Sequence, residues 1–176
     1  MNLSRRASTA LLVLLAVLVQ LSIVQRIEVG DASPDLVVLV IVSIALLSNS
    51  VVGAVHGFFG GLALALFAAL PLGPHAMIGT LIGYWAGRWG EQLITDEHPI
   101  PPLFAGIAAT LAMQVGRPLI DFLVNPAVTS TQGIWSEAAI VTALNAALMI
   151  PVYIGVRRFL RLTTEGASFG ESAVDG

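Results

Sequence analysis

The sequence predicts an all-α integral membrane protein, folded as a compact bundle of about six transmembrane helices. Of its 176 residues, 56% are hydrophobic and only 11% are charged, and the mean hydropathy is +0.88. The polar residues are too few to cover a water-facing surface, so most of the surface is expected to face lipid. Glycines at four-residue intervals within long apolar runs are typical of membrane helices whose backbones touch.

The first predicted span covers residues 8–25. Its apolar core follows Arg5 and Arg6, as in a secretory signal, but no small-residue cleavage site comes after it. The run ends in polar residues, among them Arg26, and further apolar segments follow. We therefore expect a retained first helix.

The second predicted span, residues 34–49, is short. Its apolar part reaches roughly 21 Å at 1.5 Å per residue, which is less than the ~30 Å hydrocarbon core. It is expected either to be sunk from the outer interface or to be lengthened by burying residues 48–50 against its neighbours. A merely re-entrant second segment would reduce the count to five spans.

The third span, residues 51–70, is long enough to cross the bilayer, and the fourth covers residues 75–94. Near the end of the fourth, Tyr84, Trp85 and Trp89 indicate an aromatic belt at the membrane interface.

The polar, proline-rich residues 95–102 predict an exposed loop. The fifth and sixth spans cover residues 103–124 and 135–159. Residues 1–162 are thus predicted to form one transmembrane domain. The small, polar and acidic residues 163–176 predict a disordered cytoplasmic tail.

The arginines predict the orientation. With both termini in the cytoplasm, Arg26 alone lies in an outer loop and Arg117 lies within a span. The other arginines all fall on the inner side, as the positive-inside rule requires: Arg5, Arg6, Arg88, Arg157, Arg158 and Arg161. An odd number of spans would place one arginine-rich terminus outside.

Glycines share one face in each of two neighbouring spans, at positions i, i+4 and i+8. These are Gly53, Gly57 and Gly61 in the third span and Gly79, Gly83 and Gly87 in the fourth. Each face lets another helix approach closely, either within the bundle or from another protein. We assign these glycines, together with Phe58, to helix packing or partner contact.

Five ionisable residues are predicted near the outer ends of the spans: Asp35, His75, Arg117, Asp121 and Glu137. A charge within a span is a functional hypothesis by default, and together these residues could line one outward cavity. Arg117 and Asp121 are four residues apart and can instead pair with each other. Asp35 is favoured as a first-turn carboxylate by the helix dipole.

Other buried polar residues are expected to stabilise the bundle. Gln20, Gln114 and Asn145 lie deep in their predicted spans, where they most simply form hydrogen bonds between helices. His56 is interpreted as a packing residue with a hydrogen-bond partner such as Asn49.

Neither a metal site nor a bound cofactor is predicted. His75 lies on the predicted outer side, whereas His56 and His98 lie on the inner side. The chain has no cysteine, which excludes thiolate ligands, thiol catalysis and disulfide bonds.

Signatures of enzymes and of nucleic-acid binding are also absent. The chain has no Walker loop, zinc-binding His-Glu-x-x-His motif, nucleophile elbow or basic surface suited to nucleic acid. An intramembrane aspartyl protease would require glycine motifs that do not flank Asp35 or Asp121. We therefore expect a non-enzymatic protein.

Four motifs in a fixed order resemble the family of the rod shape-determining protein MreD. They are Pro-Asp-Leu at 34–36, Gly53 followed by Gly-Phe-Phe-Gly-Gly-Leu at 57–62, Pro-Leu-Gly-Pro-His-Ala at 71–76 and Gly-Tyr-Trp-Ala-Gly-Arg at 83–88. Their order and spacing are more specific than any one motif, and the resemblance covers most of the chain. Family members often carry an acidic residue where this chain is apolar, around Ala65, so no role is assigned to that carboxylate.

The resemblance implies a multi-pass scaffold in the bacterial cytoplasmic membrane that supports cell elongation. Its implied direct partner is the bitopic protein MreC. MreB, RodA and the class B penicillin-binding protein of RodA are implied partners within a complex for lateral peptidoglycan synthesis. A homodimer is a further option.

The family is also similar in hydropathy and span count to the S-components of energy-coupling-factor vitamin transporters, which gives an alternative function. A scaffold would use the outer cavity, the loop at 125–135 and the glycine faces to hold another protein. An S-component would enclose a vitamin at the outer side, where only Trp135 is well placed to stack on a ring. The scarcity of aromatic residues favours the scaffold.

Overall fold

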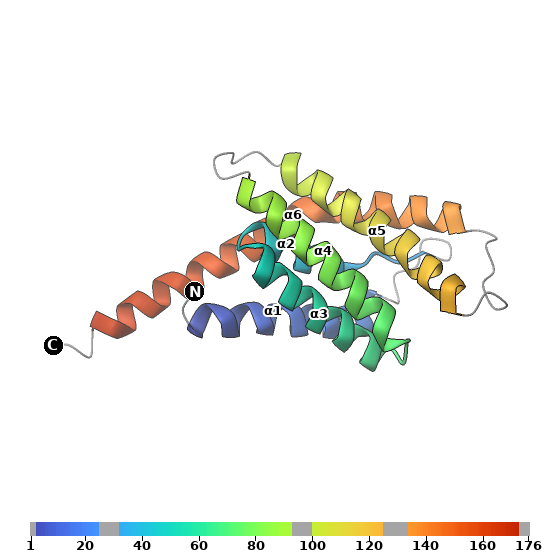
Figure 1. The fold of residues 1–176 in the computed structure, drawn as a ribbon. Helices are drawn as coiled ribbons and strands as arrows, with labels where there is room; N and C mark the ends of the chain where they lie inside the picture. Colours follow the sequence, from blue (N-terminus) through green and yellow to red (C-terminus); the bar gives the residue numbers. More distant parts are fainter. Residues whose placement is uncertain (1–2, 25–31, 93–99, 125–133, 173–176) are drawn as a thin grey trace.

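The computed structural model describes residues 3–24, 32–92, 100–124 and 134–172, and these form an all-helical bundle (Figure 1). The helices are α1 (Leu3–Ser22), α2 (Leu36–Leu46), α3 (Ser50–Phe67), α4 (Leu72–Gln92), α5 (Ile100–Val124) and α6 (Ile134–Ser172). Large apolar side chains on the outside of the bundle, such as Leu11, Phe59 and Trp85, are more than half exposed. Such a surface suits a lipid environment.

α2 is the central helix and contacts each of the other five. Residues 37–45 are all buried, and because they are apolar on every side except at Ser43, the helix has no face for solvent. Its 11 residues span only about 16 Å. The predicted lengthening over residues 48–50 does not occur, because α2 ends at Leu46 and Asn49 caps α3 by accepting a hydrogen bond from the Val52 amide at 2.9 Å.

α3 and α4 form an antiparallel hairpin joined by a tight turn. Ala69 has a φ of 53°, and the Leu70 amide donates to the Ala65 carbonyl at 2.8 Å, which is the 6→1 bond of a Schellman motif. α4 then begins at Leu72, three residues earlier than the predicted start at His75. Pro74 is tolerated there because the first turn of a helix leaves its amides unbonded.

Three helical segments are long and apolar enough to cross a membrane: α3, residues 100–120 of α5 and residues 135–163 of α6. The apolar part of α1 covers residues 6–22, and α2 is shorter still. Glycines, Arg88 and Glu91 lower the hydropathy of α4. The described residues thus form six helices, three of which could cross a membrane, and the number of six spans stays a prediction.

α6 includes residues 163–172, for which the sequence predicted a disordered tail, whereas residues 173–176 lie outside the described residues. The helix continues to Ser172, and the Thr163 hydroxyl donates to the Leu160 carbonyl at 3.0 Å within it. A helix that has already formed can continue at little cost, because each further residue adds one hydrogen bond without a new nucleation step. Figure 1 shows this last part of α6 extending beyond the bundle.

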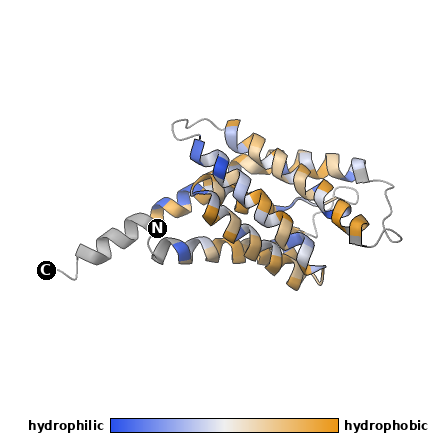
Figure 2. Ribbon diagram, in the orientation of Figure 1, coloured by the Kyte–Doolittle hydropathy of each residue, from blue (hydrophilic) through white to orange (hydrophobic). Residues whose placement is uncertain are grey.

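The hydrophilic segments of α1, α4 and α6 lie toward one end of the bundle (Figure 2). Arg6 stands near the start of α1, Arg88 near the end of α4, and Arg157 in the second half of α6. Residues 100–102, predicted to belong to an exposed loop, instead form the first turn of α5, where Pro102 is buried. The rest of that loop, including His98, and residues 125–133 of the other predicted loop lie outside the described residues.

Candidate functional site

The two glycine faces meet each other between α3 and α4. A Cβ added to Gly53 would overlap the carbonyl of Gly83, and one added to Gly57 would overlap the carbonyl of Gly79. The same contact continues at both ends of the hairpin: Gly61 faces the His75 backbone, and Gly87 faces the backbone of Asn49 and Ser50. The glycines therefore bring two backbones into contact within one chain, and these faces are covered.

Phe58 lies beside this contact rather than in it. It is 42% exposed, and its ring packs edge-to-face against Phe59 with centroids 5.3 Å apart. With Leu62, Met77 and Leu81 it lines a shallow depression over α3 and α4. Phe58 is thus available to lipid or to a partner.

A buried polar network surrounds the start of α2. Gln20 of α1 donates to the Pro34 carbonyl at 2.9 Å and accepts from the Leu36 amide at 2.7 Å. Asn145 of α6 accepts from the Asp35 amide at 2.9 Å. The Asp35 carboxylate caps the helix by accepting from the Val38 amide at 3.1 Å.

The network continues from α6 to α5. Asn145 donates through Nδ2 to the Thr110 hydroxyl at 2.9 Å, and Thr110 in turn donates to the Gly106 carbonyl at 2.8 Å. Gln20, Thr110 and Asn145 are all buried. Because α2 starts inside the bundle, its first amides cannot reach water, and these side chains provide their partners instead.

The structure describes four of the five side chains that were predicted to line an outer cavity. Asp35 interacts electrostatically with Arg117, which is half-buried and whose Nε has no hydrogen-bond partner among the described residues. His75 is buried, and its Nδ1 lies 3.3 Å from the Pro71 carbonyl. Glu137 is exposed in the first turn of α6. Asp121 lies in α5, but its side chain is outside the described residues, so its pairing with Arg117 stays a prediction.

Gln20 and Asn145 were predicted from the sequence to link helices, whereas Thr110 and the meeting point of these links at the start of α2 were not. A usable signal was present. When a helix starts within an apolar bundle, just after a proline, its first backbone N–H groups need hydrogen-bond acceptors. The side-chain amides of asparagine and glutamine in other spans can provide these acceptors. Gln114, the third predicted link, is half-buried in α5.

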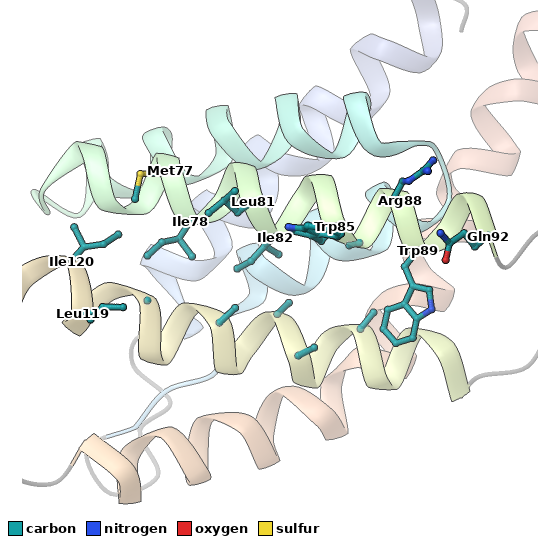
Figure 3. Close-up of a pocket in the computed structure, with 16 residues that line it drawn as sticks. Met77, Ile78, Leu81, Ile82, Trp85, Arg88, Trp89, Gln92, Leu119 and Ile120 are labelled. Carbon is teal, nitrogen blue, oxygen red and sulfur yellow. The ribbon is translucent and has the colours of Figure 1, made fainter.

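A lipid-facing groove of about 620 Å³ runs between α4 and α5 (Figure 3). Its α4 wall is bulky and includes Ile78, Ile82 and Trp89, which Figure 3 shows pointing toward α5. Most of its α5 wall is made of small residues: Ala105, Ala108, Ala109, Ala112 and Gly116. Leu119 and Ile120 add two large aliphatic side chains at one end of this wall (Figure 3). Small residues let the backbone of another helix come close, so this groove has the shape of a helix-docking surface.

Among the described residues, no group of three or more histidine, aspartate or glutamate side chains could hold a metal ion. The buried polar groups that the structure describes at the start of α2 are instead engaged with the backbone and with each other. The arrangement thus organises helices.

A family model described as rod shape-determining protein MreD matches residues 3–163. No curated protein and no solved structure gives a significant match to the chain.

Proposed function

Because the chain belongs to the MreD family of rod shape-determining proteins, we propose that it is a non-enzymatic scaffold of the cell-elongation machinery in the bacterial cytoplasmic membrane. Membership implies a membrane protein with a role in rod shape determination, in a family that is not a known enzyme family. The match over residues 3–163 carries the proposal, since it covers every described helix for most of its length.

In this proposal MreC is the direct partner, and its single transmembrane helix docks in the groove between α4 and α5. The small α5 wall at Ala108 and Ala112, both exposed, supports this site. The glycine faces of α3 and α4 are not available as a docking surface, because they cover each other. MreB, RodA and its penicillin-binding protein then join through the wider complex.

The scaffold is favoured over a vitamin-binding S-component by the use of the buried polar groups. An S-component needs polar side chains that point into an open site. Here Gln20, Thr110 and Asn145 bond to the start of α2 or to one another.

Two experiments test the two levels of the proposal. Depletion of the protein in its own bacterium should turn rod-shaped cells into spheres, and rods that persist would contradict the scaffold function.

In complemented cells, Ala112→Trp fills the groove and should lower the MreC recovered with the protein by about fivefold or more, because overpacking an interface costs about 1–3 kcal/mol.

Ala143→Trp is the matched control for Ala112→Trp. Ala143 is an exposed alanine on α6 that lines none of the described grooves. It should leave MreC recovery and cell shape unchanged. Equal recovery of MreC by both variants would refute the docking site without touching the family function.

A further inference from the structure

A second groove, of about 670 Å³, lies between α1 and α3 on another side of the bundle. Most of its walls are aliphatic or aromatic, with Val13, Val55 and Phe59 among them. Its two polar side chains are Arg6 and His56, and no carboxylate is among the described residues that line it. The volume is within the range of small-molecule sites, about 300–1,000 Å³.

The two polar side chains lie at similar levels along this groove. Gly60 packs against Val13, which aligns the two helices, since an added Cβ there would lie 3.0 Å from Val13 Cγ1. Arg6 is seven residues before Val13, and His56 is four before Gly60. At 1.5 Å per residue, parallel helices place Arg6 and His56 within about 5 Å of each other along the axis.

His56 has one ring nitrogen left for a ligand. Its Nδ1 lies 2.8 Å from the Val52 carbonyl, and because a carbonyl only accepts, Nδ1 carries the proton of that bond. In the neutral ring Nε2 is then an acceptor, suited to a hydroxyl group. The neighbouring Arg6 is exposed and supplies a permanent positive charge.

The charge of Arg6 distinguishes this groove from the one between α4 and α5. Arg88 at that other groove pairs with Glu91 at 3.2 Å, and Glu91 is also bound to the amide and hydroxyl of Ser50. Figure 3 also shows Arg88 pointing away from α5. The groove between α1 and α3 therefore combines an apolar channel with the positive charge of Arg6, and its described lining residues include no carboxylate.

We propose that this groove binds an anionic glycerophospholipid, with its phosphate at Arg6, a headgroup hydroxyl at His56 and one acyl chain along Val13 and Phe59. The groove matches such a lipid in charge and polarity, because Arg6 and His56 lie at similar levels and the other lining residues are apolar. Basic residues where helices meet the cytoplasmic leaflet attract anionic headgroups. The site is separate from the proposed MreC groove and depends only on the protein's location in a membrane.

Native mass spectrometry of the full-length protein in detergent, titrated with phosphatidylglycerol, tests the proposal. Arg6→Gln should weaken phosphatidylglycerol binding about fivefold, the effect of the ~1 kcal/mol that one arginine contributes at an anionic surface. Arg88→Gln removes the same charge at the same end of the bundle and should have little effect. Equal affinity in wild type and Arg6→Gln would overturn the site.

The apolar part of the groove has its own pair of variants. Ala10→Trp fills the groove and should reduce binding, whereas Leu11→Trp, at a 58% exposed neighbour outside it, should not. Equal binding by Ala10→Trp and wild type would contradict the proposed acyl position. Phosphatidylcholine should bind more weakly than phosphatidylglycerol, and the two binding equally would overturn the role of charge.

The occupant is identified by photocrosslinking in cells from a benzophenone amino acid at Val51, on the 68% exposed rim of the groove. A phospholipid adduct is the expected product, and a protein adduct in its place would overturn the lipid assignment. Displacement of phosphatidylglycerol by millimolar inorganic phosphate would also overturn the lipid assignment, because it would show that the site needs only an anion and not the lipid tail.

Discussion

At the scale of single residues, Asn145 shows how a polar side chain is accommodated in this apolar bundle. Both halves of its amide are used, since Oδ1 accepts from Asp35 and Nδ2 donates to Thr110. If the side-chain amide were turned over, its Nδ2 group would face the backbone N–H of Asp35, and both of these groups are donors. One fully buried side chain thus joins α6 to the start of α2 and to α5.

Replacement of Asn145 by alanine is expected to destabilise the protein by about 1–2 kcal/mol, because it leaves the Asp35 amide buried without its partner. Thermal unfolding in detergent measures the loss. Thr142→Val is the control on the same helix, since the Thr142 hydroxyl donates only within α6, to the Ala138 carbonyl at 2.6 Å. A loss as large for Thr142→Val would refute a special role for the link between helices.

Ala69 gives a prediction of opposite sign. A left-handed conformation costs an L-residue roughly 1–2 kcal/mol, and glycine avoids most of this cost. Ala69→Gly should therefore raise the free energy of unfolding by about 0.5–1 kcal/mol. Ala68→Gly, at a neighbour with a φ of −88°, should lower it by about 0.5 kcal/mol. Stabilisation by both variants would show that φ is not the cause.

At the scale of elements, the hairpin of α3 and α4 is the closest helix pair in the bundle, because each glycine removes the side chain that would keep the backbones apart. Most of the atoms that an added Cβ would meet in these contacts belong to the backbone. They cannot move aside as a flexible side chain can. The hairpin therefore tolerates less change than the surrounding apolar core, where side chains can shift.

Gly57→Ala should destabilise the protein by about 1–3 kcal/mol through overlap with Gly79 and Thr80. The same substitution at Gly155 of α6, where an added Cβ meets nothing within 4 Å, should stabilise it by about 0.5–1 kcal/mol because alanine favours a helix. Unfolding by denaturant in mixed micelles measures both. Equal effects at the two positions would disprove the proposed backbone contact.

The elements also show what the sequence could and could not predict. The four-residue spacing indicated which faces of α3 and α4 are small, because spacing fixes a face of a helix. It could not tell whether those faces meet each other, since that depends on the turn at Ala69. The outer cavity stays a prediction. Asp35 lies at the start of α2, as the sequence indicated, but the Asn145 partner of its amide depends on where that helix starts within the bundle.

At the scale of the whole molecule, the structure places a short helix, apolar except at Ser43, inside a ring of five others. The remaining helices cover α2 and present their own apolar side chains outward. Their hydrophilic segments gather toward one end (Figure 2), which is consistent with the predicted cytoplasmic position of both termini.

Reporter fusions test the predicted orientation. Alkaline phosphatase, which is active only outside the cytoplasm, should be inactive when fused after residue 176 and active when inserted between residues 125 and 133. A green fluorescent protein at the N-terminus should fluoresce. Phosphatase activity at the C-terminal fusion would contradict an even number of spans.

The hydrogen bond between the Asp35 amide and Asn145 also limits how early the bundle can fold during synthesis. Its two partners are separated by 110 residues in the chain. At a synthesis rate of about 5–20 residues per second, the ribosome needs roughly 5–20 s to deliver the second partner after the first. During that interval the start of α2 depends on the insertion machinery or on water for its hydrogen bonds, so maturation of the bundle is completed only when its last helix arrives.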